Sequence, residues 1–387
     1  MLRWQLLADS ILVTGVRYQH YRLVGSTERQ LRVLRVDLQQ PSLEVKFIPA
    51  LPGRRETLAD IVQRYDTLHP PFRILAAVNG YFWSRFGILP VGLAATDGEL
   101  LQAQRYKRWS TLVLDARGRM RLDTFLLELW ARFPGGYRVP LHAVNRRTDT
   151  MGIVLYTRFA GDTIPRHSPM VVSLPDEENP DSLVLHSVPL DTIELGLWKL
   201  RLRYLRSPFL NGALPCQLLG YDSGVAVMPL RGCLLSLGRD FPAEALPRLG
   251  DTVWLESSFS PPLPFPVEQV WSGTPRLVRD GRLSIEAARE GTTSSRFLHR
   301  RRARTAVGIT RQRELVLAVV EQNQSSAGAT VAELAQWMRR LGVYQALNLD
   351  GGSSSGLYLH GGASFGNDFP VASALAVIQR MYRRSVP

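Results

Sequence analysis

Most of the chain carries the hydrophobic pattern of β-strands. Apolar and polar residues largely alternate over residues 31–36 and 43–48, as they do in strands that bury one face. Residues 74–78 and 315–320 are short, continuous apolar runs, which are typical of strands buried on both faces. The pattern therefore predicts a strand-rich protein.

Two segments instead carry a helical pattern with clear start signals. Thr57 is followed by Asp60, and Thr330 by Glu333, at the spacing of a helix N-cap and its capping partner. Gly342 is a plausible terminator of the second helix. The residues expected to face inward are Leu58, Ile61, Val62 and Tyr65 in the first helix, and Val331, Leu334, Ala335, Met338 and Leu341 in the second.

Many short strands and only two clear helices predict an α+β fold, with a large mixed β-sheet core, few helices and long loops. We expect residues 1–387 to form a single domain. Residues 130–270 have the least transparent pattern. Four prolines within residues 261–266 predict an extended connector at the end of that region.

Two of the apolar strands end in polar residues followed by glycine. Asn348 and Asp350 precede a run of glycine and serine over residues 351–356, and Asn79 and Gly80 end an upstream strand. Glycine lets a ligand approach the backbone, and successive N–H groups in such a turn can bind an anion. We expect the two strand ends to converge on one site. The plain alternative for each is an ordinary turn.

Several segments together resemble the phosphodiester glycosidase family. They occur in the family's order, so the resemblance covers about residues 40–380. It implies the family's fold and, as the activity, hydrolysis of a sugar-1-phosphodiester. The matching segments are 76–82 (AAVNGYF), 90–92 (PVG), 273–278 (GTPRLV), 304–309 (RTAVGI), the capped helix over 330–341, and 348–353 (NLDGGS).

The resemblance, together with the chemistry of a phosphodiester, assigns roles to these residues. Arg304 is the expected cation beside the phosphate, because a guanidinium group binds phosphate through two parallel hydrogen bonds. Asp350 and Glu321 are the expected carboxylates for proton transfer, and Asn79 is expected to donate to developing negative charge. The residues expected to bind substrate are Asn348, Gly80, Phe82, Thr305, Gly351, Gly352, Ser353, Ser354 and Gly273.

Three positions near this site depart from the family's pattern. Glu321 and Gln322 stand where Asp-Gly is usual, Ser353 where a third glycine is usual, and Tyr81 where a small residue or Asp is common. The first hypothesis is a hydrolase that cleaves a glycosyl phosphodiester in a cell-envelope component or exopolysaccharide. The departures motivate a second: a non-catalytic protein that binds phosphorylated glycans or assists exopolysaccharide assembly on the same scaffold.

The net charge of +13 comes almost entirely from arginine, with lysine only at positions 46, 107 and 199. Arginine favours an anionic ligand, so we expect a phosphorylated glycan or another anionic small molecule as the partner. Biased coding composition is the plain alternative. A third hypothesis, a protein acting on nucleic acid, rests on charge alone; zinc-finger and RNP signatures are absent, so we do not expect that partner.

The basic residues 286–304 have two interpretations: a solvated surface segment, or a mobile, arginine-lined cover over an anionic site.

No cluster of His, Cys and Asp with metal-ligand spacing occurs along the chain, although Asp350 could join one formed in space. We expect no cofactor to be required, and we leave open whether a divalent metal binds and which residues would be its ligands.

Cys216 and Cys233 lack a Cys-x-x-Cys spacing and are expected to be buried free thiols, with pairing in an oxidising compartment as the alternative.

No apolar run is long enough to predict a transmembrane helix. The N-terminus lacks a basic region followed by an apolar segment, because Asp9 interrupts the apolar residues 6–8. By sequence alone a cytoplasmic location is expected, whereas the resemblance implies a family that is often exported. The sequence does not indicate an oligomeric state.

Overall fold

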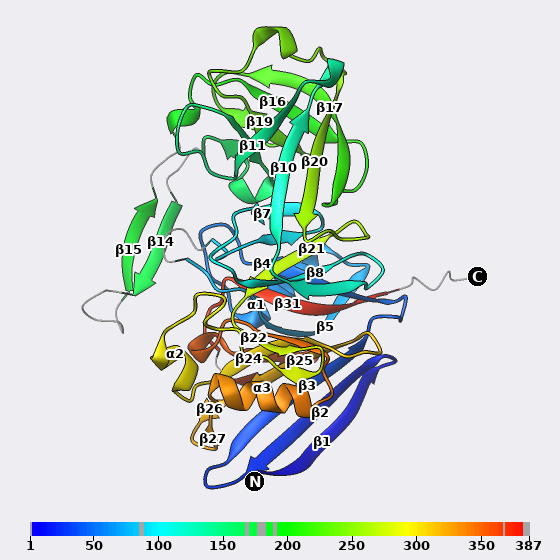
Figure 1. Cartoon of the computed structure of the whole chain (residues 1–387), viewed down its shortest axis with the longest axis vertical. Helices are drawn as coiled ribbons and strands as arrows, with labels where there is room; N and C mark the ends of the chain where they lie inside the picture. Colours follow the sequence, from blue (N-terminus) through cyan, green and yellow to red (C-terminus); the bar gives the residue numbers. More distant parts are fainter. Residues whose placement is uncertain are drawn as a thin grey trace.

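The computed structural model describes residues 2–84, 89–166, 170–175, 183–188, 192–366 and 368–381. The molecule is elongated, with a β-barrel at one end, the N-terminal strands at the other and layered sheets between them (Figure 1). The described residues contain many strands and three α-helices. The predicted fold, a β-sheet core with few helices, is therefore confirmed, and its strands are divided among several sheets.

The largest sheet has eight strands and contains the resemblance segment 304–309, part of 273–278 and the start of 348–353. Its neighbouring strands are antiparallel. In spatial order they are β1 (Arg3–Val13), β2 (Val16–Val24), β3 (Arg29–Asp37), β25 (Glu314–Val320), β24 (Arg304–Ile309), β28 (Gln345–Asn348), β22 (Arg276–Arg279) and β23 (Arg282–Leu283).

Two five-stranded sheets pack beside it, and both are antiparallel. The first consists of β30 (Ala363–Gly366), β29 (Gly356–Leu359), β5 (Phe72–Asn79), β31 (Ser373–Arg380) and β4 (Leu43–Pro49). The second consists of β7 (Glu99–Gln102), β6 (Ala94–Thr96), β21 (Gln269–Gly273), β8 (Ser110–Leu114) and β9 (Met120–Asp123).

The region with the least transparent pattern forms a closed barrel that contains one parallel strand pair, β11 with β12. The barrel core is continuous with that of the second five-stranded sheet, because Val113 and Val270 of the sheet cluster with Leu200 and Val253 of the barrel. A single domain over the whole chain remains a prediction. The barrel strands are β10 (Leu126–Arg132), β11 (Arg138–Val144), β12 (Ile153–Tyr156), β19 (Gly232–Ser236), β16 (Lys199–Tyr204), β17 (Gly212–Asp222) and β20 (Thr252–Ser260).

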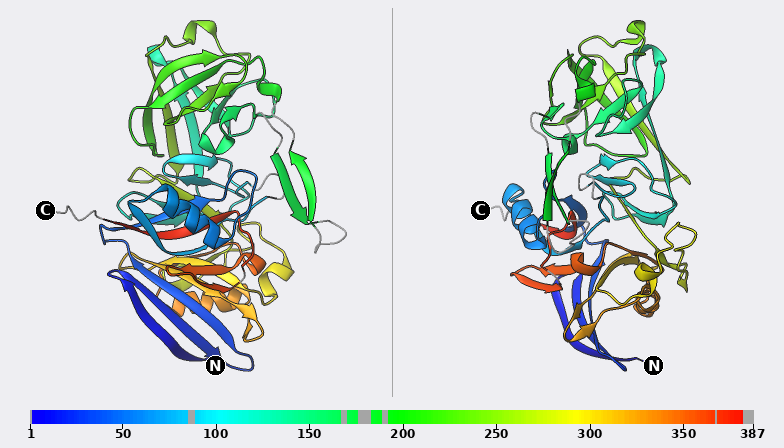
Figure 2. Two further views of the ribbon diagram at one scale, coloured as in Figure 1. Left: turned by 180° about the vertical axis from the view of Figure 1, so that it is seen from behind. Right: turned by 90° about the vertical axis from the view of Figure 1, so that its left-hand side faces the viewer.

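Three strand pairs lie outside these sheets. One of them, a hairpin, extends from the barrel along the side of the molecule (Figure 2). The pairs are β13 (Thr163–Ile164) with β18 (Ala226–Val227), β14 (Met170–Pro175) with β15 (Leu183–Val188), which is the hairpin, and β26 (Gln322–Asn323) with β27 (Ser326–Ala327).

Both predicted helices are present with the predicted caps. Helix α1 (Leu58–Leu68) begins after Thr57, whose hydroxyl accepts from Asp60 N while the Asp60 carboxylate accepts from Thr57 N. Helix α3 (Val331–Arg340) has the same capping box between Thr330 and Glu333. The predicted apolar faces are buried in both helices. The third helix, α2 (Ser295–His299), lies within the basic segment 286–304.

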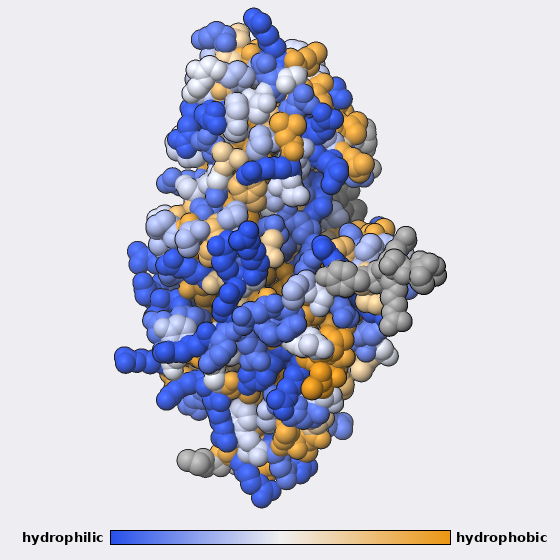
Figure 3. All heavy atoms as spheres, turned by 90° about the vertical axis from the view of Figure 1, so that its right-hand side faces the viewer, coloured by the Kyte–Doolittle hydropathy of each residue, from blue (hydrophilic) through white to orange (hydrophobic). Residues whose placement is uncertain are grey.

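The surface and the thiols agree with the composition. On the face drawn in Figure 3, hydrophilic side chains predominate and hydrophobic ones form scattered groups. Cys216 and Cys233 are free and buried inside the barrel, as predicted. Among the described residues, no helix is both long and apolar enough to cross a membrane.

Candidate active site

The two strand ends predicted to converge do meet. Asn79 ends β5 of the first five-stranded sheet, and Asp350 follows β28 of the eight-stranded sheet. The Asn79 amide Nδ2 donates to the Asp350 carbonyl oxygen at 2.7 Å, and the Asp350 N–H donates to the Gly80 carbonyl oxygen at 3.4 Å. The junction of two sheets therefore holds the loop that carries Asp350.

Asn79 positions this junction with both ends of its amide. Its Oδ1 accepts from the Thr305 hydroxyl at 2.6 Å and from Gly356 N at 3.3 Å, while Nδ2 holds Asp350. The side chain is fully buried. This geometry differs from the prediction that Asn79 donates to developing negative charge, because its hydrogen bonds already join the two sheets. Thr305, predicted to bind substrate, takes part in the same network.

The Asp350 carboxyl group is half-buried and has no ion pair among the described residues. Burial raises its pKa to about 6, while hydrogen bonds from the Ser354 hydroxyl and the Gly351 N–H act in the opposite direction. A carboxyl group with a pKa near 6 can give up or take a proton near neutral pH. Of the predicted catalytic residues, Asp350 has the environment that general acid–base chemistry requires.

The glycine–serine loop after Asp350 is compact. The N–H groups of Gly351, Gly352 and Ser354 donate to Asp350 Oδ1, the Ala303 carbonyl and the Gly351 carbonyl, respectively. These bonds use most of the N–H groups that were expected to cradle a phosphate. Gly352 has a φ of +67°, which favours glycine, and Ser353 is exposed while Ser354 is buried.

Arg304 lies beside this loop, but its guanidinium group binds backbone carbonyls. Nε donates to Ala329 O at 3.0 Å, and Nη2 donates to Phe297 O at 2.6 Å and Arg300 O at 3.1 Å. Burial, and then the charge of Arg302, lower the pKa of Arg304 to about 10. These bonds fix the end of α2, and the prediction that Arg304 meets the phosphate stays a prediction. No ion pair among the described residues joins it to Asp350.

A cluster of arginines in the same segment offers positive charge to the loop instead. Arg302 Nη1 lies 3.9 Å from the position that a Cβ on Gly352 would take. Burial lowers the pKa of Arg302, and the charges of Arg300 and Arg296 lower it further. Among the described residues none of the three has an ion pair. We call Arg296, Arg300 and Arg302 the arginine cluster; the arginine-rich sequence at 300–304 was the signal for it.

Glu321, the second predicted carboxylate, is engaged in a separate cluster. It forms a short ion pair with Arg32, and its other oxygen accepts from Asn323 Nδ2 at 2.9 Å. The Arg32 guanidinium also stacks 3.6 Å from the centre of the Phe365 ring. Both Glu321 oxygens are therefore occupied, and the prediction of proton transfer by Glu321 is replaced by a structural ion pair.

Asn348 and the two predicted glycines pack closely at the base of the site. Asn348 Nδ2 donates to the carbonyls of Thr274 at 2.7 Å and Leu349 at 2.9 Å, whereas its buried Oδ1 has no hydrogen-bond partner among the described residues. A Cβ on Gly273 would lie 2.5 Å from Asn348 O, and one on Gly80 would lie 2.3 Å from Ser373 Oγ. Both glycines are thus explained by close packing.

The aromatic residues after Gly80 serve different purposes. Tyr81 is buried, and its hydroxyl donates to the Ala372 carbonyl at 3.2 Å, so it anchors the core. Phe82 is half-buried, with its ring centre 5.2 Å from that of Trp109 and 6.1 Å from that of Phe297 in α2. Phe82 therefore connects the Asn79 strand end to the basic segment.

One buried carboxylate near the site had no signal in the sequence. Glu290 accepts from the hydroxyls of Ser110 at 2.6 Å and Thr274 at 2.7 Å, and from Arg276 N at 3.1 Å. Burial raises its pKa. Glu290 holds the Thr274 hydroxyl, and the Thr274 carbonyl accepts from Asn348, so Glu290 helps to fix the base of the site without touching Asp350. Only contacts between residues distant in sequence show this role of Glu290.

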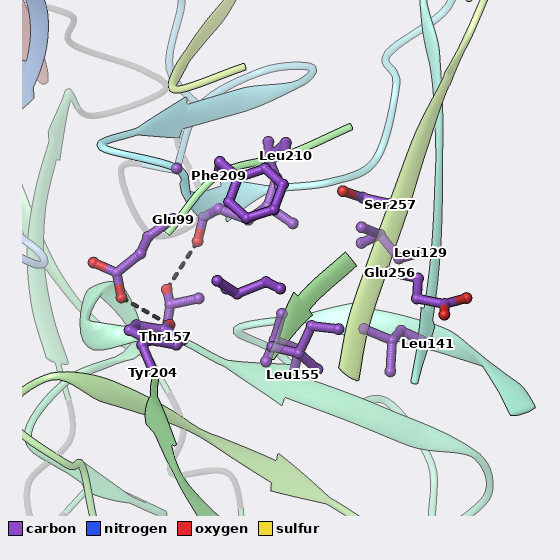
Figure 4. Close-up of a pocket in the computed structure, with 14 residues that line it drawn as sticks. Glu99, Leu129, Leu141, Leu155, Thr157, Tyr204, Phe209, Leu210, Glu256 and Ser257 are labelled. Atoms are coloured by element: carbon purple, nitrogen blue, oxygen red, sulfur yellow. Dashed lines mark hydrogen bonds between the residues drawn. The ribbon is translucent and has the colours of Figure 1, made fainter. Parts of the chain in front are cut away.

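A cavity inside the barrel does not belong to this site. Its volume is about 30 Å³, enough for about two water molecules. Figure 4 shows Glu99, Thr157 and Tyr204 on one side of it and leucines opposite, with the Tyr204 hydroxyl donating to Glu99 at 3.0 Å. Across the part of the chain that the structure describes, no group of three or more His, Cys, Asp and Glu is arranged to hold a metal ion.

Comparison with known proteins finds a family match in the C-terminal part of the chain. Residues 240–378 match the phosphodiester glycosidase family. Over 104 residues the chain is 33% identical to N-acetylglucosamine-1-phosphodiester alpha-N-acetylglucosaminidase of Mus musculus and 35% identical to that of Bos taurus. These matches cover 25% of this chain and 20% of each relative. The match with these relatives thus spans about a fifth of their length.

Two solved structures share the fold over nearly the whole chain. A hypothetical protein from Synechocystis superposes with a TM-score of 0.66 at 20% identity, covering 97% of this chain and 64% of that one. A putative exported protein from Burkholderia pseudomallei superposes with a TM-score of 0.60 at 15% identity, covering 97% of both chains. At these identities the likeness concerns the fold alone. Through residues 240–378, this chain bears a distant resemblance to the phosphodiester glycosidase family.

Proposed function

We propose that the chain is a hydrolase that cleaves a glycosyl phosphodiester in a glycan or cell-envelope component, with Asp350 as its acid–base residue. The observation that carries the proposal is the state of the Asp350 carboxyl group: it is half-buried, has no ion pair among the described residues and has a pKa raised to about 6. The family match supports the reaction class, because the matching segment contains this residue.

The arginine cluster would bind the phosphodiester. A phosphodiester carries one negative charge, and guanidinium groups bind phosphate oxygens through charge-assisted hydrogen bonds. Arg302 approaches the backbone of Gly352, two residues after Asp350. Arg304 donates to the carbonyls of Phe297 and Arg300, and these bonds fix the segment to which the arginine cluster belongs. A cation and a proton-transfer group would therefore act on the same linkage.

In the proposed reaction one water molecule adds across the linkage, and one bond of the sugar–oxygen–phosphorus bridge breaks. Asp350 would supply the proton to the leaving oxygen or remove it from the water. Asn79 and Thr305 would contribute indirectly, by holding the Asp350 loop between two sheets. The experiment is a screen of the purified protein against sugar-1-phosphodiesters, with a parallel sample treated with a metal chelator.

Turnover in ¹⁸O-labelled water then identifies the bond that breaks. Label in the sugar means attack at the anomeric carbon, and label in the phosphate means attack at phosphorus. Binding of the diesters without turnover by the wild-type protein would instead support a non-catalytic phosphoglycan-binding protein, the alternative suggested by Glu321, Gln322, Tyr81 and Ser353. Loss of turnover in the chelated sample alone would show that a divalent metal is needed.

A further inference from the structure

Another arginine, outside the arginine cluster, also lacks a carboxylate partner among the described residues, and it lies in the segment between β4 and α1. Arg55 precedes α1 and is half-buried. Its guanidinium carbon lies 5.1 Å from the ring centre of Trp83 and 5.0 Å from that of Phe369. Cation–π contacts with two aromatic rings hold the side chain in a fixed orientation without neutralising its charge.

The acids nearest to Arg55 in the sequence are already engaged. The Glu56 carboxylate is paired with Arg64 at 2.7 Å and also accepts from Leu51 N at 2.9 Å. Asp60 caps α1 through Thr57. Among the described residues Arg55 has neither an ion pair nor a hydrogen bond, and its Nη1 is a buried donor without an acceptor. A buried guanidinium donor without an acceptor is costly, and an anionic ligand would relieve that cost.

This group is linked to the Asp350 loop through the chain that follows β5. The Gly80 carbonyl accepts from Asp350 N at 3.4 Å. Trp83 is three residues beyond Gly80, so their Cα atoms are at most about 11 Å apart. Phe369 is tied to the segment that carries Arg55, because Glu56 and Val371 exchange backbone hydrogen bonds of 2.7 and 3.0 Å. A substrate that contacts both Asp350 and Arg55 would have to extend from the loop toward Trp83.

We propose that Arg55, held between Trp83 and Phe369, binds a second acidic group of the glycan, either a carboxylate or a phosphate on a sugar next to the phosphodiester. The substrate would thus be an acidic glycan with one charge at the arginine cluster and another at Arg55. The planar guanidinium group suits a carboxylate or phosphate, whose two oxygens can accept in parallel. This inference rests on the proposed function for the identity of the ligand as a glycan.

The test measures binding, so it does not require turnover. Calorimetric titrations compare glucuronate and glucose 6-phosphate with uncharged glucose, on the wild-type protein and on Arg55→Gln, Arg54→Gln and Arg302→Gln. Arg54 is the matched control, because it is the exposed neighbour of Arg55 and its loss changes the net charge equally. Thermal melting checks that each variant is folded, and Arg55→Lys replaces Arg55→Gln if the latter unfolds.

The wild-type protein should bind one of the two acidic sugars more tightly than glucose, and Arg55→Gln should weaken that binding about 10-fold while Arg54→Gln leaves it unchanged. The preferred probe tells a carboxylate from a phosphate. Three outcomes would overturn the proposal. The wild-type protein could bind all three sugars with equal affinity, Arg55→Gln and Arg54→Gln could lose affinity equally, or the loss of affinity could be confined to Arg302→Gln. Turnover of a sugar-1-phosphodiester, measured separately, tests the proposed function itself.

Discussion

The Glu194 carboxylate, buried against the outer side of the barrel, lies between two cations, whereas the Asp350 carboxylate at the junction of the sheets has no ion pair among the described residues. Glu194 is fully buried and contacts Arg147, with Lys199 Nζ at 3.8 Å. Its oxygens also accept from the hydroxyls of Tyr156 at 2.8 Å and Ser236 at 2.5 Å. This carboxylate is compensated on every side.

Asp350 differs in its surroundings. Its partners are the Gly351 N–H and the Ser354 hydroxyl, and burial raises its pKa to about 6. A buried carboxylate between two cations fixes the fold through its ion pairs. A carboxyl group with a raised pKa and no ion pair can change its protonation state near neutral pH. The comparison teaches that burial of an acid alone does not indicate a role in proton transfer, because the partners around the acid decide what it can do.

The largest effect should come from breaking the compensated cluster. Glu194→Gln removes the charge between Arg147 and Lys199, and the free energy of unfolding should fall by about 3–5 kcal/mol, because both cations are buried. Denaturant unfolding followed by circular dichroism measures it. The matched control is Glu256→Gln, on the barrel exterior, which pairs with Arg132 and Arg138 at partly exposed positions. This control should cost about 1 kcal/mol or less. Equal losses would contradict the contrast between buried and exposed pairs.

Asp350→Asn should lower turnover of a sugar-1-phosphodiester by about 100-fold or more, equivalent to about 2.7 kcal/mol of barrier. The variant keeps the size and hydrogen bonding of the side chain, so it should remain folded and bind the diester. Steady-state kinetics together with thermal melting separates the two effects. Asp368→Asn, an exposed position in the same part of the chain, should be unaffected. Full activity in folded Asp350→Asn protein would remove Asp350 from the mechanism.

Arg302→Gln should raise the KM for a phosphodiester about 10-fold, because one charge-assisted contact with the phosphate is lost, while kcat changes less. The matched control is Arg301→Gln. The Arg301 side chain pairs with Glu333 at the start of α3, so the KM of this variant should stay near the wild-type value. If both variants raise KM equally, the effect comes from overall charge and the arginine cluster is not a binding site.

The last effect concerns the pH dependence of stability. Because burial raises the pKa of Asp350 from its ordinary 3.8 to about 6, the folded chain binds this proton more tightly than the unfolded chain does. Its contribution to stability is full below about pH 4 and is lost as the pH rises through about 6. The free energy of unfolding of wild type relative to Asp350→Asn should therefore fall over that interval. A constant difference across it would show that the raised pKa is absent.

The sequence by itself determined the elements whose signals are local. The capping residues and apolar stripes of α1 and α3 lie within one or two helical turns, so their boundaries follow from the residues alone. The apolar runs that became β5 and β28 were also visible, as were the polar residues at their ends. The convergence of Asn79 and Asp350 followed from two similar strand ends, because buried polar groups at such ends need partners.

The tertiary structure alone decided which charged side chain does what. Glu321 and Arg304 are residue types that the expected chemistry needs. In the fold, however, Glu321 forms an ion pair with Arg32, which is distant in sequence, and Arg304 donates to backbone carbonyls at the end of α2. The barrel's closure and the placing of Arg55 between Trp83 and Phe369 also depend on contacts between distant segments. The role of a charged residue depends on which partners the folded structure places within contact of it. Local pattern cannot encode those partners, so the sequence indicated where the candidate site lies, and the fold determined which charged groups surround it.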